Sequence, residues 1–177
     1  AKLQPGEEVI PFNALMMLEA DQKPFVAPWI EQFGLMPWLN RLLEISVLPV
    51  WHLLVHHGLA VEAHGQNMLL VHKNGWPVRL MLRDFHESVE FCPSFLREPA
   101  KAPDFMAMDA RYRNAEPDQY YWTDNMDSLR ELVVDTLFVY NLAEIAHLFE
   151  HAYQLPEASF WQRVESLLAT YAAQHGA

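Results

Sequence analysis

One unit between Glu62 and Phe85 constrains the fold more than any other part of the chain. Two apolar runs flank the tripeptide Lys73-Asn74-Gly75. Asn-Gly between two apolar runs is the strongest short-range signal for a β-hairpin. Hairpin strands run antiparallel, so the two ends of the unit must meet. The sequence therefore predicts an antiparallel hairpin over residues 67–82 with its open ends side by side.

Polar side chains gather at both ends of this predicted hairpin, although each strand is apolar. They are Glu62, His64, Gln66 and Asn67 before the first strand, and Arg83 and Asp84 after the second. Mg²⁺ prefers oxygen ligands and commonly takes one or two carboxylates plus phosphate oxygens. Arg and His can neutralise the remaining phosphate charge. The pattern predicts a site for a divalent metal that holds a polyphosphate.

A purely structural explanation competes with this prediction. Hairpins with polar ends are common, and Arg83 beside Asp84 also fits a surface ion pair of little energetic value. Taken singly, each of the six residues is better explained by structure than by catalysis. Their convergence at one sheet edge favours a phosphate or metal site, and on the residues alone both explanations stay open.

The segment from Val55 to Phe85 resembles the signature of siderophore synthetases that work independently of peptide synthetases, the IucA/IucC family. The shared motif is a helix ending in His-Gly, then Glu-Ala-His-x-Gln-Asn, an apolar hairpin and Arg-Asp, here at Gly58, Glu62, Ala63, His64, Gln66, Asn67, Arg83 and Asp84. Weaker similarity covers most of the chain. Because members of this family are several times longer, residues 1–177 look like a single C-terminal, palm-like domain without the N-terminal part.

The resemblance also implies an activity. Enzymes of this family use ATP to convert a carboxylate, usually one arm of citrate, into an acyl adenylate. An amine or hydroxylamine then attacks, which forms an amide or ester and releases AMP. The expected cofactors are therefore ATP and Mg²⁺, the expected substrates are a citrate-like carboxylate and an amine or hydroxylamine, and the expected partner is the rest of the synthetase.

By the same resemblance, each polar residue of the hairpin ends takes a role. Glu62, Asn67 and Asp84 would hold Mg²⁺ against the phosphates. His64 and Arg83 would be the catalytic groups, with His64 on phosphate and carboxylate. Gln66 and Arg83 would orient the nucleotide or support the metal ligands. The family's upstream phosphate-binding residues are not in this chain, so we expect it to fold alone but to catalyse poorly or not at all.

Two other functions remain as alternatives. The same C-terminal domain occurs in ferric-siderophore reductases of the FhuF type, which bind an iron–sulfur cluster through cysteines. Such a cluster needs four thiolates or near equivalents, and this chain has one cysteine, Cys92. The other alternative is a domain that binds citrate or a nucleotide without turnover.

Composition limits the domain size, the partners and the cellular compartment that fit this chain. The chain has 177 residues, half of them hydrophobic, which is enough for one domain with a proper core. The net charge of −11 and the lack of Lys/Arg clusters argue against nucleic acid as a partner. No apolar run approaches the roughly twenty residues of a membrane span, and the lone cysteine fits a reducing cytoplasm. Formation of a homodimer is an open alternative.

Helical periodicity dominates the rest of the chain. Three helices are predicted. The first covers residues 37–57 and is kinked or split at Pro49. The second covers 126–154, is capped by Thr123 or Asp124 and has Tyr140 on its apolar face, and the third covers 157–173. The first thirty residues and 93–124 read as irregular, and 87–91 as a third strand beside the hairpin. The predicted fold class is α+β, a mainly helical domain whose small antiparallel sheet carries the ligand site.

Three further groups of residues are weaker candidates for chemistry. His52 and His56, like His147 and His151, lie four apart, a spacing that can bind zinc. The sequence supplies no third ligand in a recognised order, and such pairs are more often on partly buried helix faces. Tyr120-Tyr121-Trp122 could stack on a ligand but fits a core or interface better. Arg111 and Arg113 are candidate anion contacts, although solvated side chains explain them equally well.

Overall fold

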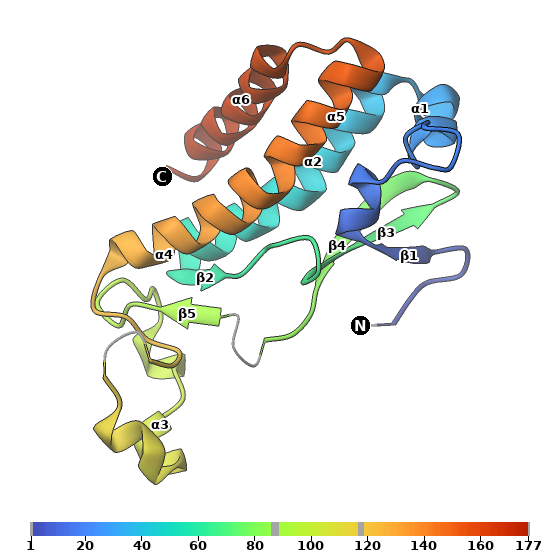
Figure 1. Ribbon diagram of the computed structural model, residues 1–177. Coiled ribbons are helices and arrows are strands. Elements are labelled where there is room, and N and C mark those ends of the chain that lie inside the picture. The colour runs from blue at the N-terminus through green and yellow to red at the C-terminus, as the bar shows by residue number, and fades with distance from the viewer. Residues whose placement is uncertain (1, 86–88, 117–118, 177) are drawn as a thin grey trace.

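A computed structural model of the chain describes residues 2–85, 89–116 and 119–176. Helices form most of the body, a small antiparallel sheet packs along one side, and the stretch between Pro93 and Asp124 projects from the body (Figure 1). This arrangement confirms the predicted α+β class. The fold is organised around the contact between the hairpin and the helices.

The hairpin forms as predicted from strands β3 (Met68–Lys73) and β4 (Trp76–Leu82). Its antiparallel register pairs Met68 with Leu82 at the open end and Lys73 with Trp76 at the turn. Asn74 and Gly75 both adopt positive φ, 48° and 87°. That backbone is typical of a type I′ turn, whose twist matches the twist of the flanking strands.

The third strand of this sheet is not the one predicted from sequence. Strand β1 (Glu8–Pro11) pairs antiparallel with β3, so the predicted irregular start of the chain is wrong at this point. Pro11 is tolerated because β1 is an edge strand, where a missing N–H costs no sheet hydrogen bond. The same stretch also forms a 3₁₀ turn, Phe12–Met16, and helix α1 (Ala27–Phe33).

The strand predicted over 87–91 exists in part but joins a different sheet. Residues 87 and 88 lie outside the described residues, and β5 (Val89–Phe91) pairs antiparallel with β2 (Leu59–Val61). The backbone of Asp84, with φ of 58°, lies in the left-handed region just after β4. This breaks the extended conformation that a continued meander would need.

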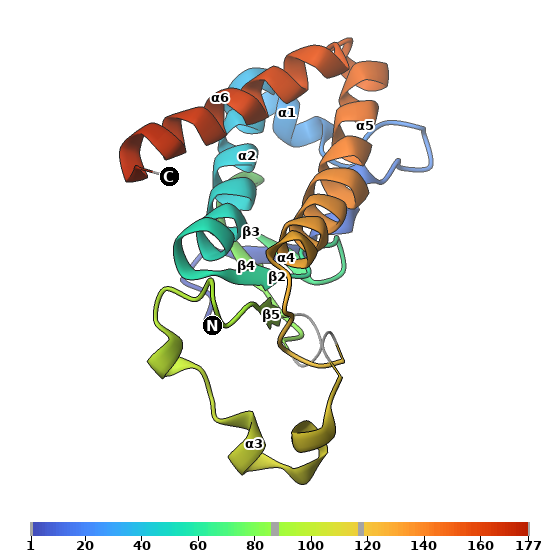
Figure 2. The ribbon, with the colours of Figure 1, turned by 90° about the vertical axis from the view of Figure 1, so that its left-hand side faces the viewer.

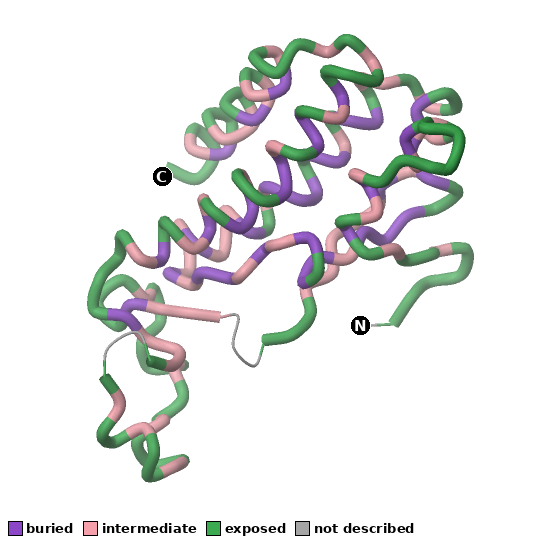
Figure 3. Tube along the Cα trace, in the orientation of Figure 1, coloured by how far each residue is buried: buried purple, intermediate pink, exposed green. Residues whose placement is uncertain are grey.

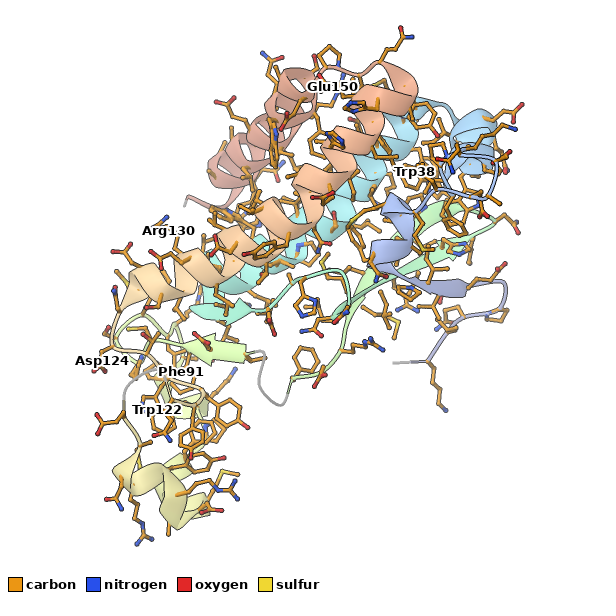
Figure 4. The ribbon with its side chains drawn as sticks, in the orientation of Figure 1. Trp38, Phe91, Trp122, Asp124, Arg130 and Glu150 are labelled. Atoms are coloured by element: carbon orange, nitrogen blue, oxygen red, sulfur yellow. The ribbon has the colours of Figure 1, made fainter. Side chains whose placement is uncertain are left out.

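Helices α1 and α2 (Leu35–His52) hold the tip of the hairpin. The indole N–H of Trp38, in α2, donates to the carbonyl of Gly75 at 2.8 Å, in a buried position (Figure 4). Trp29 of α1 packs directly on Gly75, where a built Cβ atom would lie 2.1 Å from Trp29 Cδ1. Glycine is therefore required here both for its φ and for this contact. The tip of the hairpin is fixed, which leaves its open end for the site.

Both long helices contain π-helical turns, which the sequence pattern did not predict. Helix α2 continues past Pro49 and ends in a π turn, Leu53–His57, closed by Gly58 with φ of 73°. The predicted 126–154 helix is formed by α4 (Met126–Val133), a π-helical segment Val134–Leu142, and α5 (Ala143–Tyr153). The wider π turns shift the helical phase.

Two details of the long helix correct the sequence-based prediction. Tyr140, predicted on the apolar face, is 64% exposed, because the π-helical segment rotates it toward solvent. The N-cap is Asn125, whose side chain accepts from the N–H of Asp127, rather than Thr123 or Asp124. The buried Thr123 instead hydrogen-bonds through its hydroxyl to Asn125.

The continuous helix Met126–Tyr153 is long and apolar enough, by length and composition, to cross a membrane. In the fold it is a core helix. Buried positions recur along it (Figure 3) and include Leu129, Leu137, Ile145 and Phe149. The ring of Phe149 contacts the ring of Trp38. The apolar side chains of this helix are therefore explained by packing within the protein.

The C-terminal helix α6 (Glu157–His175) packs against α2 and α5, and the short connection over residues 154–156 joins α5 to it (Figure 2). The 93–124 stretch holds the 3₁₀ turn Pro99–Lys101, helix α3 (Phe105–Met108) and the 3₁₀ turn Ala110–Asn114. Phe105 stacks on Tyr121, with ring centroids 5.0 Å apart, and Phe91 forms a bridge with Trp122 (Figure 4). The aromatic cluster thus packs the projecting segment onto β5.

The free energy of unfolding should depend on pH through the protonation of His72. Burial holds the pKa of His72 below its ordinary value of 6.5, with Glu8 acting weakly in the opposite direction. The neutral Nδ1 accepts from the N–H of Gly75 at 3.2 Å. The unfolded chain therefore binds more protons than the folded chain at mildly acidic pH, so this contribution is complete above the unfolded pKa and is lost below it.

We expect the urea midpoint of unfolding to fall between about pH 7.5 and about pH 5.5, and to fall less in His72→Gln. The exposed His147 offers a matched control, and His147→Gln should keep the pH dependence of the unmodified protein. Equal pH dependence in all three proteins would contradict this assignment.

Candidate functional site

The site is built on the loop Glu62–Asn67, between β2 and β3. His64 organises the turn: its carbonyl accepts from the N–H groups of Asn67 and Met68 at 2.9 and 3.1 Å. Its Nδ1 accepts from the N–H of Gln66 at 3.1 Å. These bonds occupy Nδ1 within the loop, so Nε2 is the ring nitrogen that remains for other partners.

The two ends of the hairpin meet, as the sequence predicted. The N–H of Arg83 donates to the carbonyl of Asn67 at 3.0 Å, which extends the β3–β4 pairing by one step. The guanidinium Nε of Arg83 donates to the carbonyl of Gln66 at 2.7 Å. Arg83 is therefore fixed to the loop by both its backbone and its side chain, and the exposed Asp84 follows directly.

Polar side chains inside the loop are linked to one another. Asn67, only 6% exposed, donates from Nδ2 to the carboxylate of Glu62 at 3.3 Å and to its carbonyl at 3.2 Å. Nε2 of His64 lies 3.6 Å from the other carboxylate oxygen of Glu62. Glu62 and Asn67, predicted as metal ligands, thus lie in contact, with His64 beside them.

The donor chemistry of this loop fits a magnesium ion with phosphates. Glu62 supplies carboxylate oxygens, the amide of Asn67 is held against Glu62 through Nδ2, and the exposed Asp84 follows Arg83 in the chain. Oxygen donors with few carboxylates are what Mg²⁺ requires when phosphate completes its shell. The guanidinium of Arg83 and the ring N–H of His64 can donate hydrogen bonds to phosphate oxygens.

The π-helical segment Val134–Leu142 holds this loop from behind. The hydroxyl of Thr136 accepts from the N–H of Ala63 at 3.0 Å, and Nδ2 of Asn141 donates to the carbonyl of Ala63 at 2.6 Å. Both side chains are buried. They lie five residues apart, and i→i+5 bonding brings residues of that spacing onto one face. The π turn thus allows two polar side chains to hold both backbone groups of Ala63.

Sequence reasoning missed Thr136 and Asn141. The available signal was two uncharged polar residues within the mainly apolar stretch from Leu132 to Ile145, which also holds Asp135 and Glu144. Read with α-helical periodicity, they fall on different faces and point to no common partner. Only the π-helical geometry makes them neighbours.

Gly65 lets the loop pack closely against its surroundings. A Cβ atom built on Gly65 would lie 2.9 Å from Cβ of Asn13 and 3.0 Å from Oδ1 of Asn141. The carbonyl of Gly65 accepts from the N–H of Asn13 at 3.3 Å. A side chain at this position would push the loop, with Glu62 and Asn67, away from the body.

An apolar cavity of about 430 Å³ has Phe85, the residue after Asp84, in its lining. Leu59 and Phe91 of the small β2–β5 sheet also line it, and so do Tyr121 and Phe105 of the projecting segment.

The weaker candidates lie elsewhere. Arg111 pairs with Asp109 at 2.8 Å, and Nε of Arg113 donates to the carbonyl of Met106 at 3.1 Å, both in the projecting segment. These contacts support local structure and do not place either side chain at the Glu62–Asn67 loop. Cys92 is buried, with its sulfur 3.2 Å from the hydroxyl of Ser94.

Comparison with known proteins is consistent with this geometry. The sequence profile of the family described as "Ferric iron reductase FhuF-like transporter" matches residues 36–177. The chain belongs to the FhuF-like family. The match includes every predicted site residue, from Glu62 to Asp84.

Individual relatives of this FhuF-like domain are siderophore enzymes. A citryl-spermidine/3,4-dihydroxybenzoyl-citryl-spermidine:spermidine ligase of Bacillus anthracis is 43% identical over 158 residues, which cover 89% of this chain and 26% of the ligase. The crystal structure of the petrobactin biosynthesis protein AsbB from Bacillus anthracis str. Sterne matches with a TM-score of 0.94 and 40% identity, over 98% of this chain and 29% of AsbB.

The aerobactin synthetase IucC of Klebsiella pneumoniae matches with a TM-score of 0.84 and 28% identity, over 98% of this chain and 30% of IucC. The resemblance to siderophore synthetases is thereby confirmed, and the fold is that of the C-terminal region of AsbB and IucC. The chain spans about a quarter of the length of the curated relatives it matches.

The anchor at Ala63 generates a prediction for stability. Thr136→Val keeps the shape of the side chain but removes the acceptor for the buried N–H of Ala63, which should cost about 1–3 kcal/mol in the free energy of unfolding. Thr136→Ser keeps the hydroxyl and should cost less. Urea denaturation of the three proteins measures both effects, and equal losses in the Val and Ser variants would contradict the anchoring role.

Proposed function

We propose that this domain supplies the metal- and phosphate-binding part of an ATP-dependent siderophore synthetase, which joins a carboxylate to an amine or hydroxylamine. The observation that carries the proposal is the meeting of the two hairpin ends, where Arg83 is bonded to the Glu62–Asn67 loop through its backbone and side chain and Asn67 contacts Glu62. The family and the relatives support the same conclusion.

The negative charge of this chain opposes the binding of a triphosphate. Its net charge of −11 repels anions at long range. A Mg²⁺ ion held at this site would supply the local positive charge that phosphate binding needs. Glu62, Asn67 and Asp84 would hold the ion, and the Thr136 and Asn141 anchors at Ala63 would keep Glu62 in place when the ion and phosphates bind.

His64 and Arg83 would act on the reacting groups. The outward Nε2 of His64 can donate to a phosphate or carboxylate oxygen, because Nδ1 is already an acceptor within the loop. Arg83 keeps one guanidinium nitrogen on the carbonyl of Gln66 and can turn its other N–H groups toward phosphate. Gln66 and Arg83 would thus orient the nucleotide, and His64 and Arg83 would stabilise charge that develops during transfer.

The reaction proceeds in two steps. A carboxylate oxygen attacks the α-phosphorus of ATP, which forms the acyl–phosphate bond of an adenylate and expels pyrophosphate. The lone pair of an amine or hydroxylamine then attacks the acyl carbon, so that AMP leaves and the proton of the nucleophile goes to a base. Activation is required because a free carboxylate is a poor acyl donor at neutral pH.

The substrates we propose are a citrate-like carboxylate and an amine or hydroxylamine. The relative from Bacillus anthracis is named for citryl and spermidine groups, which places such substrates within the chemistry of related proteins. The apolar cavity beside Phe85 can accommodate the carbon chain of an organic substrate. The partner we propose is the remainder of the synthetase, in the cytoplasm.

A ferric-siderophore reductase is the second candidate, since the family description names one. The 177 residues contain a single cysteine, buried Cys92. An iron–sulfur cluster bound by cysteines needs three more ligands. The residues therefore favour the synthetase over the reductase. A domain that binds nucleotide or citrate without turnover remains the third candidate.

Carboxylate-dependent ATP–pyrophosphate exchange tests the proposal. In the synthetase that contains this domain, Asp84→Asn removes a carboxylate ligand and should lower the exchange rate by about a hundredfold or more, because a metal-assisted charge interaction is lost in the transition state. Asp109→Asn, in the projecting segment, is the matched control and should leave exchange unchanged. The 177-residue chain by itself should show little or no exchange.

Three outcomes would contradict the proposal. Asp84→Asn with unimpaired exchange would remove the site from the reaction, and robust exchange by the chain alone would overturn the need for upstream residues. Binding of Mg·ATP by calorimetry without exchange in the complete synthetase would favour the domain that binds without turnover.

A further inference from the structure

The π turn at the end of α2 brings three imidazoles together. In a regular α-helix, His57 would point about 140° away from His52, because each residue advances the helix by about 100°. In the π turn Leu53–His57, i→i+5 bonding brings these two residues nearly onto one face, beside His56. One ligand nitrogen from each of His52, His56 and His57 lies within 4.8 Å of the others.

This cluster corrects the expectation that the His52–His56 pair lacks a third ligand. The rings of His52 and His56 stack, with centroids 4.4 Å apart and planes at 17°. The ring of His57 stands nearly perpendicular to both, at 5.1 and 4.8 Å. The third imidazole is the next residue in sequence after His56, and only the π turn makes it a neighbour of His52.

Tyr171 of α6 orients the first imidazole. Its hydroxyl oxygen lies 2.6 Å from Nδ1 of His52, a hydrogen bond between two elements far apart in sequence. With Nδ1 engaged in this way, Nε2 of His52 is the nitrogen presented to the cluster. A metal-ligating histidine commonly has its other ring nitrogen fixed by such a bond.

Arg97 lies against the second imidazole of the cluster. Nη1 of Arg97 lies 2.8 and 2.6 Å from the two ring nitrogens of His56. A metal ligand must offer a nitrogen lone pair, so a metal ion that binds His56 competes with this guanidinium.

We propose that His52, His56 and His57 form a binding site for a divalent transition-metal ion of the kind that imidazole prefers, such as Zn²⁺. The exposed side chain of Arg97 leaves when the metal enters, because both compete for His56. A cavity of about 270 Å³ lined by His56, Arg97, Tyr171 and His175 lies beside the cluster. Nitrogen ligands distinguish this site from the oxygen-lined magnesium site proposed at Glu62.

The chain offers a matched control in His147 and His151. Their rings lie 4.1 Å apart in α5, at the same i,i+4 spacing as His52 and His56. Among residues 2–85, 89–116 and 119–176, no third His, Cys, Asp or Glu joins them in a group that could hold a metal. Nδ1 of His151 is bonded to the carbonyl of His147 within the helix.

Titration of the 177-residue chain with Co²⁺, followed by visible absorption, tests the site, with Zn²⁺ added as a competitor. We expect saturable binding, with d–d bands that Zn²⁺ abolishes. Affinity should fall by about a hundredfold in His56→Ala and in His57→Ala, and by about tenfold in Tyr171→Phe, which loses only the orienting bond. The double variant His147→Ala/His151→Ala should bind like the unmodified chain.

Arg97→Ala supplies a test in which the variant should bind metal more tightly, so a loss of folding could not produce the expected result. Because Arg97 is exposed and competes with the metal for His56, its removal should increase affinity for Co²⁺ and Zn²⁺ by several-fold. Far-UV circular dichroism confirms that each variant is folded. Absence of saturable binding, equal binding by His57→Ala, loss of binding in the His147/His151 variant, or weaker binding by Arg97→Ala would each overturn the proposal.

Discussion

The candidate site depends on how the backbone of Ala63 is held. Thr136 and Asn141 engage its N–H and its carbonyl, respectively, from a buried helix. Glu62 immediately precedes this anchor, and His64, Gln66 and Asn67 follow it, so the anchor sets the position of the loop residues that the site requires. Because both partners are buried polar groups, breaking either bond leaves an unsatisfied group in the core. The loop is therefore held in one place before any ligand arrives.

The hairpin links this loop to the rest of the body at its opposite end. Trp38 and Trp29 fix the turn at Gly75, while Arg83 ties the open end to Gln66 and Asn67. A ribbon held at both ends positions its terminal side chains with little freedom, as binding of a metal–phosphate complex requires. The same principle recurs at the other π turn, where helix geometry and Tyr171 arrange three imidazoles.

Much of this could be predicted from the sequence, because local signals were strong. The Asn74-Gly75 turn specified the hairpin, and antiparallel pairing then required Arg83 to approach Asn67. Strand β1 was missed because its pairing with β3 spans some sixty residues and Pro11 obscures it. The π turns were missed because helical patterns assume a constant period, so Thr136, Asn141 and His57 seemed to point in unrelated directions. Tyr140 was misplaced for the same reason.

The central claim is that the open end of the hairpin and its anchored loop hold a metal-bound triphosphate. The most direct measurement is paramagnetic broadening of amide signals in a ¹⁵N-labelled chain, on addition of Mn²⁺ with a non-hydrolysable ATP analogue. The account predicts that the amides of Ala63, Asn67, Arg83 and Asp84 show the strongest broadening that depends on the nucleotide. Nucleotide-dependent broadening centred elsewhere, or no nucleotide-dependent broadening, would contradict it.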